Sequence, residues 1–137
     1  MEVIQSIQKQ LQQEVDAFRQ IQLDVQQNHR LRQQSLQQQH ENEMVLQELK
    51  LLSEGASVYK MIGPALVKQD TLEAQSNVNK RLEFIAGELK RLDSQLQQLE
   101  EKQRKKQEQL AKLQTELQRV QQQAGLAVQQ QAGLAAA

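Results

Sequence analysis

The strongest constraint on this chain is an apolar stripe in its second half that recurs about every 3.5 residues. Its positions follow one another in alternating steps of four and three: Val78, Leu82, Ile85, Leu89, Leu92, Leu96, Leu99, Gln103, Lys106, Leu110, Leu113, Leu117 and Val120. This period keeps the stripe on one side of a helix and specifies a left-handed coiled coil with a single partner stripe. The pattern predicts a helix over about residues 71–123.

A second helical pattern occupies the first part of the chain. Its apolar residues, spaced by three or four, are Ile4, Ile7, Leu11, Val15, Phe18, Ile21 and Val25. This spacing predicts a helix from about residue 3 to residue 53. The pattern weakens over residues 26–42, and we expect it to resume at Val45, Leu49 and Leu52.

A short segment of different character separates the two helical patterns. The runs Val58-Tyr59-Lys60-Met61-Ile62 and Ala65-Leu66-Val67-Lys68-Gln69 flank Gly63-Pro64. Apolar and β-branched runs around such a pair predict a β-hairpin over about residues 57–69. Gly63 can supply the positive φ, and Pro64 the negative φ, of a type II′ turn. Gly55 is expected to end the first helix, and Asp70 to cap the second.

The predicted fold class is therefore mainly α, a long antiparallel two-helix coiled coil with a β-hairpin at the connection between the helices. A lone two-stranded hairpin is marginal in water and leaves both edges unpaired. Apolar side chains leave little of either face polar, so we expect hairpins of several chains to pair. The residues expected to mediate subunit assembly are Val58, Tyr59, Met61, Ile62, Gly63, Pro64, Leu66 and Val67. Lys60 and Lys68 are expected to limit wrong edge pairing.

The two chain ends form the other candidate site. In an antiparallel pair the beginning of the first helix lies beside the end of the second, and helix ends fray. The apolar residues expected there are Ile4, Ile7, Leu11, Leu113, Leu117 and Val120. They can be offered to another molecule without a fixed pocket. The same residues are also what an intact coiled-coil seam requires, and the sequence leaves both interpretations open.

Composition excludes several classes of function. With two Phe, one Tyr and no Trp the chain lacks the bulky side chains of a globular core, and without Cys it has no disulfide or thiol chemistry. The formal net charge of zero disfavours binding to nucleic acid or to a membrane. The sequence contains no catalytic triad pattern and no phosphate-binding glycine loop. We expect no enzyme activity and no cofactor, and we expect a protein of the cytoplasm, with the nucleus left open.

Two polar features have plain interpretations. His29 and His40 are about three helical turns apart, so we expect surface histidines and no metal site. The basic run over residues 102–106 resembles a nuclear signal or a nucleic-acid patch, but Glu100, Glu101 and Glu108 flank it. A solvated helix face is the favoured interpretation.

The end of the chain repeats itself, because residues 121–127 and 129–135 both read Gln-Gln-Gln-Ala-Gly-Leu-Ala. We interpret residues 124–137 as a low-complexity tail and predict that it is disordered. An interaction motif in this tail is the alternative.

The hairpin and the segment after it resemble a known family. The stretch Val58-Tyr59-Lys60-Met61-Ile62-Gly63-Pro64-Ala65-Leu66-Val67-Lys68-Gln69, followed by Val78-Asn79-Lys80-Arg81-Leu82-Glu83-Phe84-Ile85, is similar to the beta-type prefoldin subunits, and among them to the eukaryotic subunit 6 group. The resemblance covers roughly residues 3–120. The repeated tail has no counterpart in it.

The resemblance implies a function. Prefoldin is a hetero-hexamer of two alpha-type and four beta-type subunits joined through their hairpins, and it holds unfolded clients without ATP. The implied partners are the other prefoldin subunits, client proteins such as actin and tubulins, and the cytosolic group II chaperonin. The alternative is a structural coiled-coil scaffold or tether without client binding, in which the hairpin is only a connector.

Overall fold

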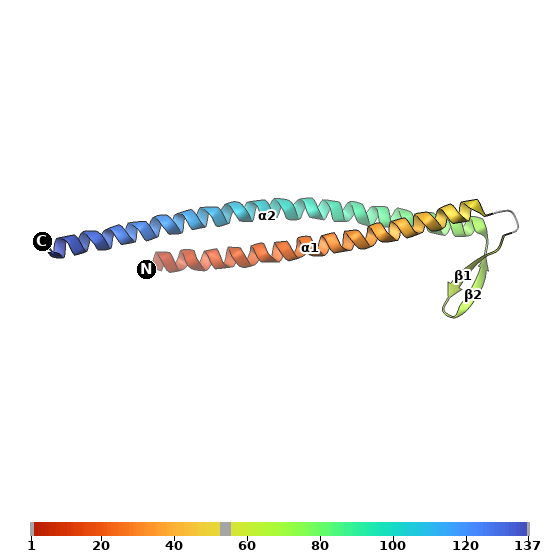
Figure 1. Ribbon diagram of the computed structural model, residues 1–137, viewed down its shortest axis with the longest axis horizontal. Coiled ribbons are helices and arrows are strands. Elements are labelled where there is room, and N and C mark those ends of the chain that lie inside the picture. Colours follow the sequence, from red (N-terminus) through yellow and green to blue (C-terminus); the bar gives the residue numbers. More distant parts are fainter. Residues whose placement is uncertain (1, 53–55, 137) are drawn as a thin grey trace. The chain divides into compact units, whose positions relative to one another are not determined.

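The computed structural model describes residues 2–52 and 56–136. It contains helix α1 (Glu2–Leu51), strands β1 (Val58–Ile62) and β2 (Ala65–Gln69), and helix α2 (Thr71–Ala136) (Figure 1). Two long helices with an antiparallel hairpin between them confirm the predicted fold class. The helix stop that we expected at Gly55 lies outside the described residues.

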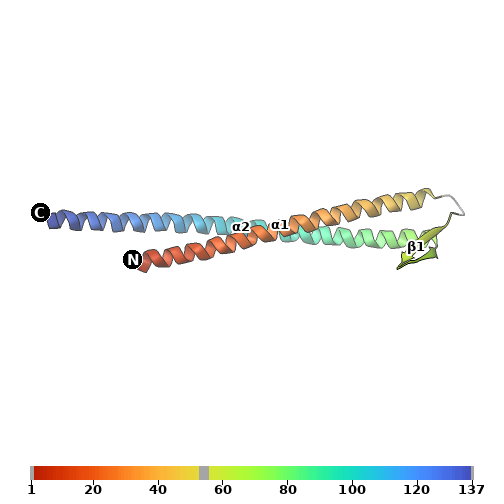
Figure 2. The ribbon, with the colours of Figure 1, turned by 60° about the horizontal axis from the view of Figure 1, so that its bottom comes forward.

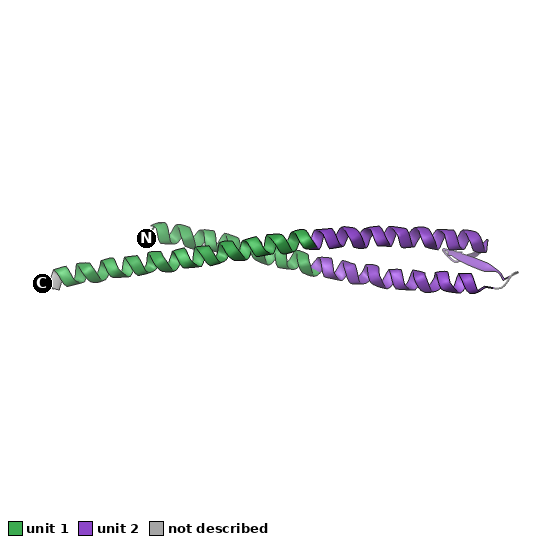
Figure 3. Cartoon of the chain, turned by 90° about the horizontal axis from the view of Figure 1, so that it is seen from above, with its two compact units in different colours: residues 1–26, 97–137 green, residues 27–96 purple. Residues whose placement is uncertain are grey.

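The chain divides into two compact units (Figure 3). Unit 1 comprises residues 1–26 and 97–137, and unit 2 comprises residues 27–96. Each unit therefore combines one part of α1 with one part of α2. The hairpin belongs to unit 2.

Unit 2 has a small apolar core where α1 ends and α2 begins. Leu49, Ala74 and Val78 are buried there, and Leu46, Val58 and Leu82 pack against them. Because Val58 is the first residue of β1, this core fixes the base of the hairpin to both helices. Figures 1 and 2 both show the hairpin beside the first turns of α2.

The turn of the hairpin follows from its two central residues. Ile62 pairs with Ala65, so only Gly63 and Pro64 connect the strands. Gly63 has a φ of 59°, which a residue with a side chain rarely adopts, whereas the ring of Pro64 enforces a negative φ. A positive φ followed by a negative one is the requirement of a type II′ turn, as expected.

The seam of α1 differs from the sequence-based expectation. Val45 and Leu52 do not rejoin the seam, because they are 46% and 41% exposed, while Leu49 is 8% exposed and Leu46 packs on the core. The stripe instead continues from Val25 in unbroken steps of three and four. Its partly or fully buried positions are Asn28, Arg32, Ser35, Gln39, Asn42, Leu46 and Leu49.

Asn28 is the most buried polar residue described, with 4% exposure. Its side-chain Nδ2 donates a hydrogen bond of 2.9 Å to the carbonyl oxygen of Leu92 on α2. Leu92 is 2% exposed, so the bond lies in the centre of the seam of unit 2. A buried amide with a partner on the facing helix restricts the register in which the helices can pair.

The end of the chain also differs from expectation. The structure continues α2 as a helix over residues 124–136, where the sequence predicted a disordered tail. Ala, Leu and Gln favour the helix, so Gly125 and Gly133, at about 1 kcal/mol each, do not end it. All side chains of residues 121–134 are exposed. Among the described residues, no helix is both long enough and apolar enough to span a membrane.

The burial of Leu92 predicts a large effect of truncation. Leu92→Ala should lower the free energy of unfolding by about 2–4 kcal/mol, because it leaves a cavity in the seam. Leu23→Ala, at a position that is 58% exposed, should change it by less than about 0.5 kcal/mol. Urea denaturation followed by far-ultraviolet circular dichroism measures both. Equal effects would contradict the seam assignment.

Candidate functional site

The hairpin carries the clearest exposed apolar surface. Val58 is partly buried by the core of unit 2, but the other large apolar side chains of both strands are exposed, Met61 by 74%. The exposed set is Tyr59, Met61, Ile62, Leu66 and Val67. Except for Val58, the residues that we expected to mediate assembly are thus exposed on the single chain.

The strand register distributes these side chains over both faces of the hairpin. Met61 pairs with Leu66 and Tyr59 with Lys68, while Ile62 pairs with Ala65 and Lys60 with Val67. Because side chains alternate along a strand, Met61 and Ile62 point to opposite faces. Both faces therefore contain large apolar groups, and neither is an ordinary solvent face.

The sheet has only two strands, β1 and β2, so within the described chain the outer edge of each strand is unpaired. Free edges of this kind pair readily with strands of other chains. The base of the hairpin, in contrast, is fixed. The carbonyl of Asp70 accepts a 2.9 Å hydrogen bond from the Ala74 N–H, which makes Asp70 the N-cap of α2, as expected.

The predicted chain-end residues lie along the seam of unit 1. Ile7 is buried, and Ile4, Leu11, Leu113, Leu117 and Val120 are partly buried. Their spacing places them on the facing sides of α1 and α2. The six residues form the seam in this conformation, and binding of another molecule would require them to become more exposed. Their role in binding stays a prediction.

A cross-helix ion pair lies in the same seam. Lys106 Nζ donates a hydrogen bond of 2.8 Å to Glu14 Oε2, and the two side chains are 30% and 27% exposed. Lys106 is one of the two polar positions in the stripe of α2. Glu14 escaped the sequence analysis because the apolar residue beside it, Val15, fits the helical spacing nearly as well.

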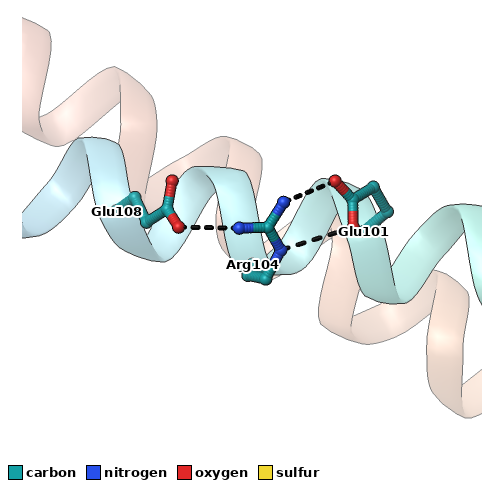
Figure 4. A network of polar contacts seen from close by, with 3 residues as sticks. All are labelled: Glu101, Arg104 and Glu108. Atoms are coloured by element: carbon teal, nitrogen blue, oxygen red, sulfur yellow. Dashed lines mark hydrogen bonds and ion pairs between the residues drawn. The ribbon is translucent and has the colours of Figure 1, made fainter.

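Arg104, within the basic run, is compensated along α2 itself. Arg104 forms ion pairs with Glu101 at 2.6 Å and with Glu108 at 2.8 Å (Figure 4). The hydrogen bond from Arg104, and then its charge, lower the pKa of Glu101. The stabilisation from this contact is present above the ordinary pKa of glutamate and is lost as the pH falls through the lowered value. A compensated, exposed run favours a solvated face over a nucleic-acid site.

Neither histidine lies in a cluster of metal ligands. His29 and His40 are both exposed. Across residues 2–52 and 56–136, no three His, Cys, Asp or Glu side chains lie close enough together to hold a metal ion.

Asn28 is a second seam residue that sequence reasoning missed. A search for apolar residues at helical spacing does not include it because it is polar. Its position is nevertheless the next one in the heptad pattern after Ile21 and Val25. Continuing the heptad phase regardless of residue type would have found it.

Comparison with known proteins gives consistent matches. A sequence profile described as "Prefoldin subunit" matches residues 12–124. Prefoldin subunit 6 of Arabidopsis thaliana is 51% identical over 93 residues, which are 68% of this chain and 72% of that protein. Prefoldin subunit 6 of Homo sapiens is 46% identical over 90 residues, which are 66% and 70%.

Solved structures show the same fold. The crystal structure of the prefoldin beta subunit from Thermococcus strain KS-1 matches with a TM-score of 0.69 and 25% identity, covering 74% of this chain and 89% of that one. The beta2 subunit from the same strain matches with a TM-score of 0.59 and 22% identity, covering 67% and 98%.

The ion pair between Glu14 and Lys106 predicts a charge-dependent register. Lys106→Glu should lower the free energy of unfolding by about 1 kcal/mol or more, because two carboxylates then face each other in the seam. Adding Glu14→Lys should recover most of that loss. The coupling should be about 0.5–1.5 kcal/mol, since both side chains retain some contact with water.

A double-mutant cycle by urea denaturation measures this coupling. Lys105→Glu, on the exposed face next to Lys106, is the matched control and should show no coupling to Glu14→Lys. A charge exchange that recovers nothing would contradict the pairing.

Proposed function

The chain belongs to the prefoldin subunit family, and on that premise we propose that it is an ATP-independent holdase subunit of a hetero-hexamer. The proposed complex captures non-native polypeptides, such as actin and tubulins, and delivers them to the cytosolic group II chaperonin. Proteins of this family are chaperone subunits that assemble with other prefoldin subunits, and they are not enzymes. A chaperone that serves the cytosolic chaperonin would work in the cytoplasm.

The observation that carries the proposal is the hairpin. Its two faces both present large apolar side chains, and its two outer edges are unpaired within the described chain. Five such side chains are exposed, and burying each would contribute about 1.5–3 kcal/mol. Assembly with sister hairpins buries these groups and pairs the edges. A simple tether would need neither, because a polar loop would connect its helices equally well.

The chain ends supply the proposed client contacts. Ile4, Leu11 and Leu117 are only partly buried in the seam, and Ile4 lies in the first turn of α1, where helix ends fray. An exposed apolar segment of a client can replace the contacts that such residues make with each other. Each contact is weak and reversible, and several subunits in one complex raise the effective concentration of the sites. Binding and release of this kind require no nucleotide.

The hairpin assignment predicts loss of assembly on charge insertion. Ile62→Asp with Leu66→Asp should dissociate the complex with sister subunits, because unpaired carboxylates would then be buried at the joint. Size-exclusion chromatography with light scattering, or native mass spectrometry, measures the mass. Ser57→Asp, which adds a charge just before β1, is the control and should leave assembly intact. A double variant that still assembles would argue against assembly through the hairpin.

The chain-end assignment predicts loss of holdase activity without loss of assembly. Replacing Ile4, Ile7, Leu117 and Val120 by Ser should raise the complex concentration needed to suppress client aggregation by about tenfold or more, because apolar contacts are lost. Light scattering of a diluted, unfolded client without ATP measures suppression.

The matched control for this variant is Val3→Ser with Leu23→Ser, which changes two exposed apolar residues of the same unit. Native mass spectrometry should show the same assembly for both variants. Unchanged suppression by the fourfold variant would remove these residues from the client site.

A further inference from the structure

Phe84, on α2 in unit 2, is the most exposed of the three aromatic side chains, at 71%. It lines a groove together with Lys80 and Arg81 of the same helix and with Gln38 and Asn42 of α1. Burial of a Phe side chain contributes about 1.5–3 kcal/mol, so the single chain leaves a favourable contact unused at this position.

A second groove adjoins the first and runs beside the hairpin, which Figures 1 and 2 show next to the first turns of α2. Arg81 lines both grooves, and the second is also lined by Val58, Tyr59 and Lys60, three successive residues of β1. Because successive side chains point to opposite faces of a strand, this groove follows the edge of β1 and not one face. We refer to the two grooves together as the hairpin–helix groove.

The backbone of β1 presents hydrogen-bonding groups along this edge. In a hairpin with a two-residue turn, the pair next to the turn, Ile62 and Ala65, exchanges both of its hydrogen bonds. Because bonded and non-bonded pairs alternate along the ladder, the N–H and C=O groups of Tyr59 and Met61 point to the outer edge. A strand that adds to β1 would bind these groups, and its side chains would meet the hairpin–helix groove at Tyr59.

The charged residues that line the hairpin–helix groove, Lys60, Lys80 and Arg81, are all basic. None of the three forms an ion pair with another described residue. Glu88, one helical turn after Phe84, is already paired with Arg91 at 2.7 Å. The groove therefore has the charge to attract a carboxylate from a partner.

A second copy of this chain fits the hairpin–helix groove poorly. Its hairpin, residues 58–69, contains Lys60 and Lys68 but no Asp or Glu. Pairing two copies at this edge would bring lysines against a basic groove, and like charges at an interface disfavour association. A different chain, whose hairpin carries a carboxylate beside large apolar side chains, meets both requirements of the groove.

We propose that the hairpin–helix groove binds the hairpin of a sister prefoldin subunit that carries at least one carboxylate, which pairs with Arg81 or Lys80 while an apolar side chain covers Phe84. The proposal rests on the proposed assembly through the hairpin and adds to it a selective contact on α2. A strand edge accepts the backbone of almost any strand, whereas a basic groove distinguishes an acidic sister subunit from a second copy.

Charge reversal tests this selectivity. Lys80→Glu with Arg81→Glu should raise about tenfold the concentration of sister subunits needed for half-maximal incorporation of the chain, because the carboxylate of the sister then meets like charge. The same variant alone should self-associate more strongly than the wild type, because Lys60 and Lys68 of a second copy would meet opposite charge. Native mass spectrometry measures incorporation, and size-exclusion chromatography with light scattering measures self-association.

The matched control is Lys102→Glu with Lys105→Glu, which makes the same change in net charge at exposed positions of α2 in unit 1. It should alter neither incorporation nor self-association. Circular dichroism should show equal helicity for both charge-reversed chains.

Phe84→Ala separates a binding role from a folding role. The ring is exposed on the single chain, so the change should leave the urea midpoint of the isolated chain nearly unchanged. In the presence of sister subunits it should raise the concentration for half-maximal incorporation about fivefold, because an apolar contact between chains is lost. Leu23→Ala, at another exposed apolar position of the chain, should change neither quantity.

The outcomes separate this inference from the proposed function. If Ile62→Asp with Leu66→Asp prevents assembly but the reversal at Lys80 and Arg81 does not weaken it, the groove is not part of the joint, although assembly through the hairpin stands. A charge-reversed complex that assembles normally but no longer suppresses client aggregation would assign the groove to clients and overturn the inference. Assembly that survives the hairpin variant would overturn the proposed joint, and this inference with it.

Discussion

Everything in this chain depends on the antiparallel pairing of two stripes with the same period. Apolar layers supply most of the free energy of that pairing, but they are nearly interchangeable and would tolerate a shift by one heptad. The polar contacts do not tolerate it. In unit 1 a shift would leave Glu14 and Lys106 without each other, and in unit 2 it would remove the Asn28 amide from the Leu92 carbonyl. An ion pair without its partner is costly in a seam, so the contact between Glu14 and Lys106 favours one register in unit 1.

The hairpin differs from the seam, because most of its large apolar side chains are exposed on the single chain. Val58 ties its base to the core of unit 2, whereas Met61, Ile62 and Leu66 remain exposed on two faces. A two-stranded hairpin is marginally stable in water unless further strands or a helix pack against it. The chain belongs to a family of subunits that assemble with one another, and burial of this apolar surface between chains would stabilise such an assembly. Lys60 and Lys68 lie on the same two strands, and charged side chains at a sheet edge disfavour indiscriminate pairing.

The sequence predicts those parts of the fold in which apolar residues occupy the buried positions and polar residues the exposed ones. The stripe of α2 could be predicted because its apolar residues keep one period. The turn at Gly63 and Pro64 could be predicted because only one common turn type fits a positive φ followed by the negative φ of proline. The seam of α1 was not readable over residues 28–42, because polar residues occupy it and apolar Val45 and Leu52 lie off it. Helical phase decides burial there, and residue type does not. The helical state of residues 124–136 escaped prediction for the converse reason, since low complexity and two glycines obscured good helix propensity.

The hairpin and the α2 stripe beyond Val120 differ in how much apolar area they leave in water. The hairpin concentrates large apolar side chains, among them Met61 and Leu66, and exposes them. Along the α2 stripe, Ala124 and Ala127 take the place of the earlier leucines, and each small side chain exposes little apolar area. Burial of the hairpin side chains would therefore release much more free energy per residue than burial of these alanines.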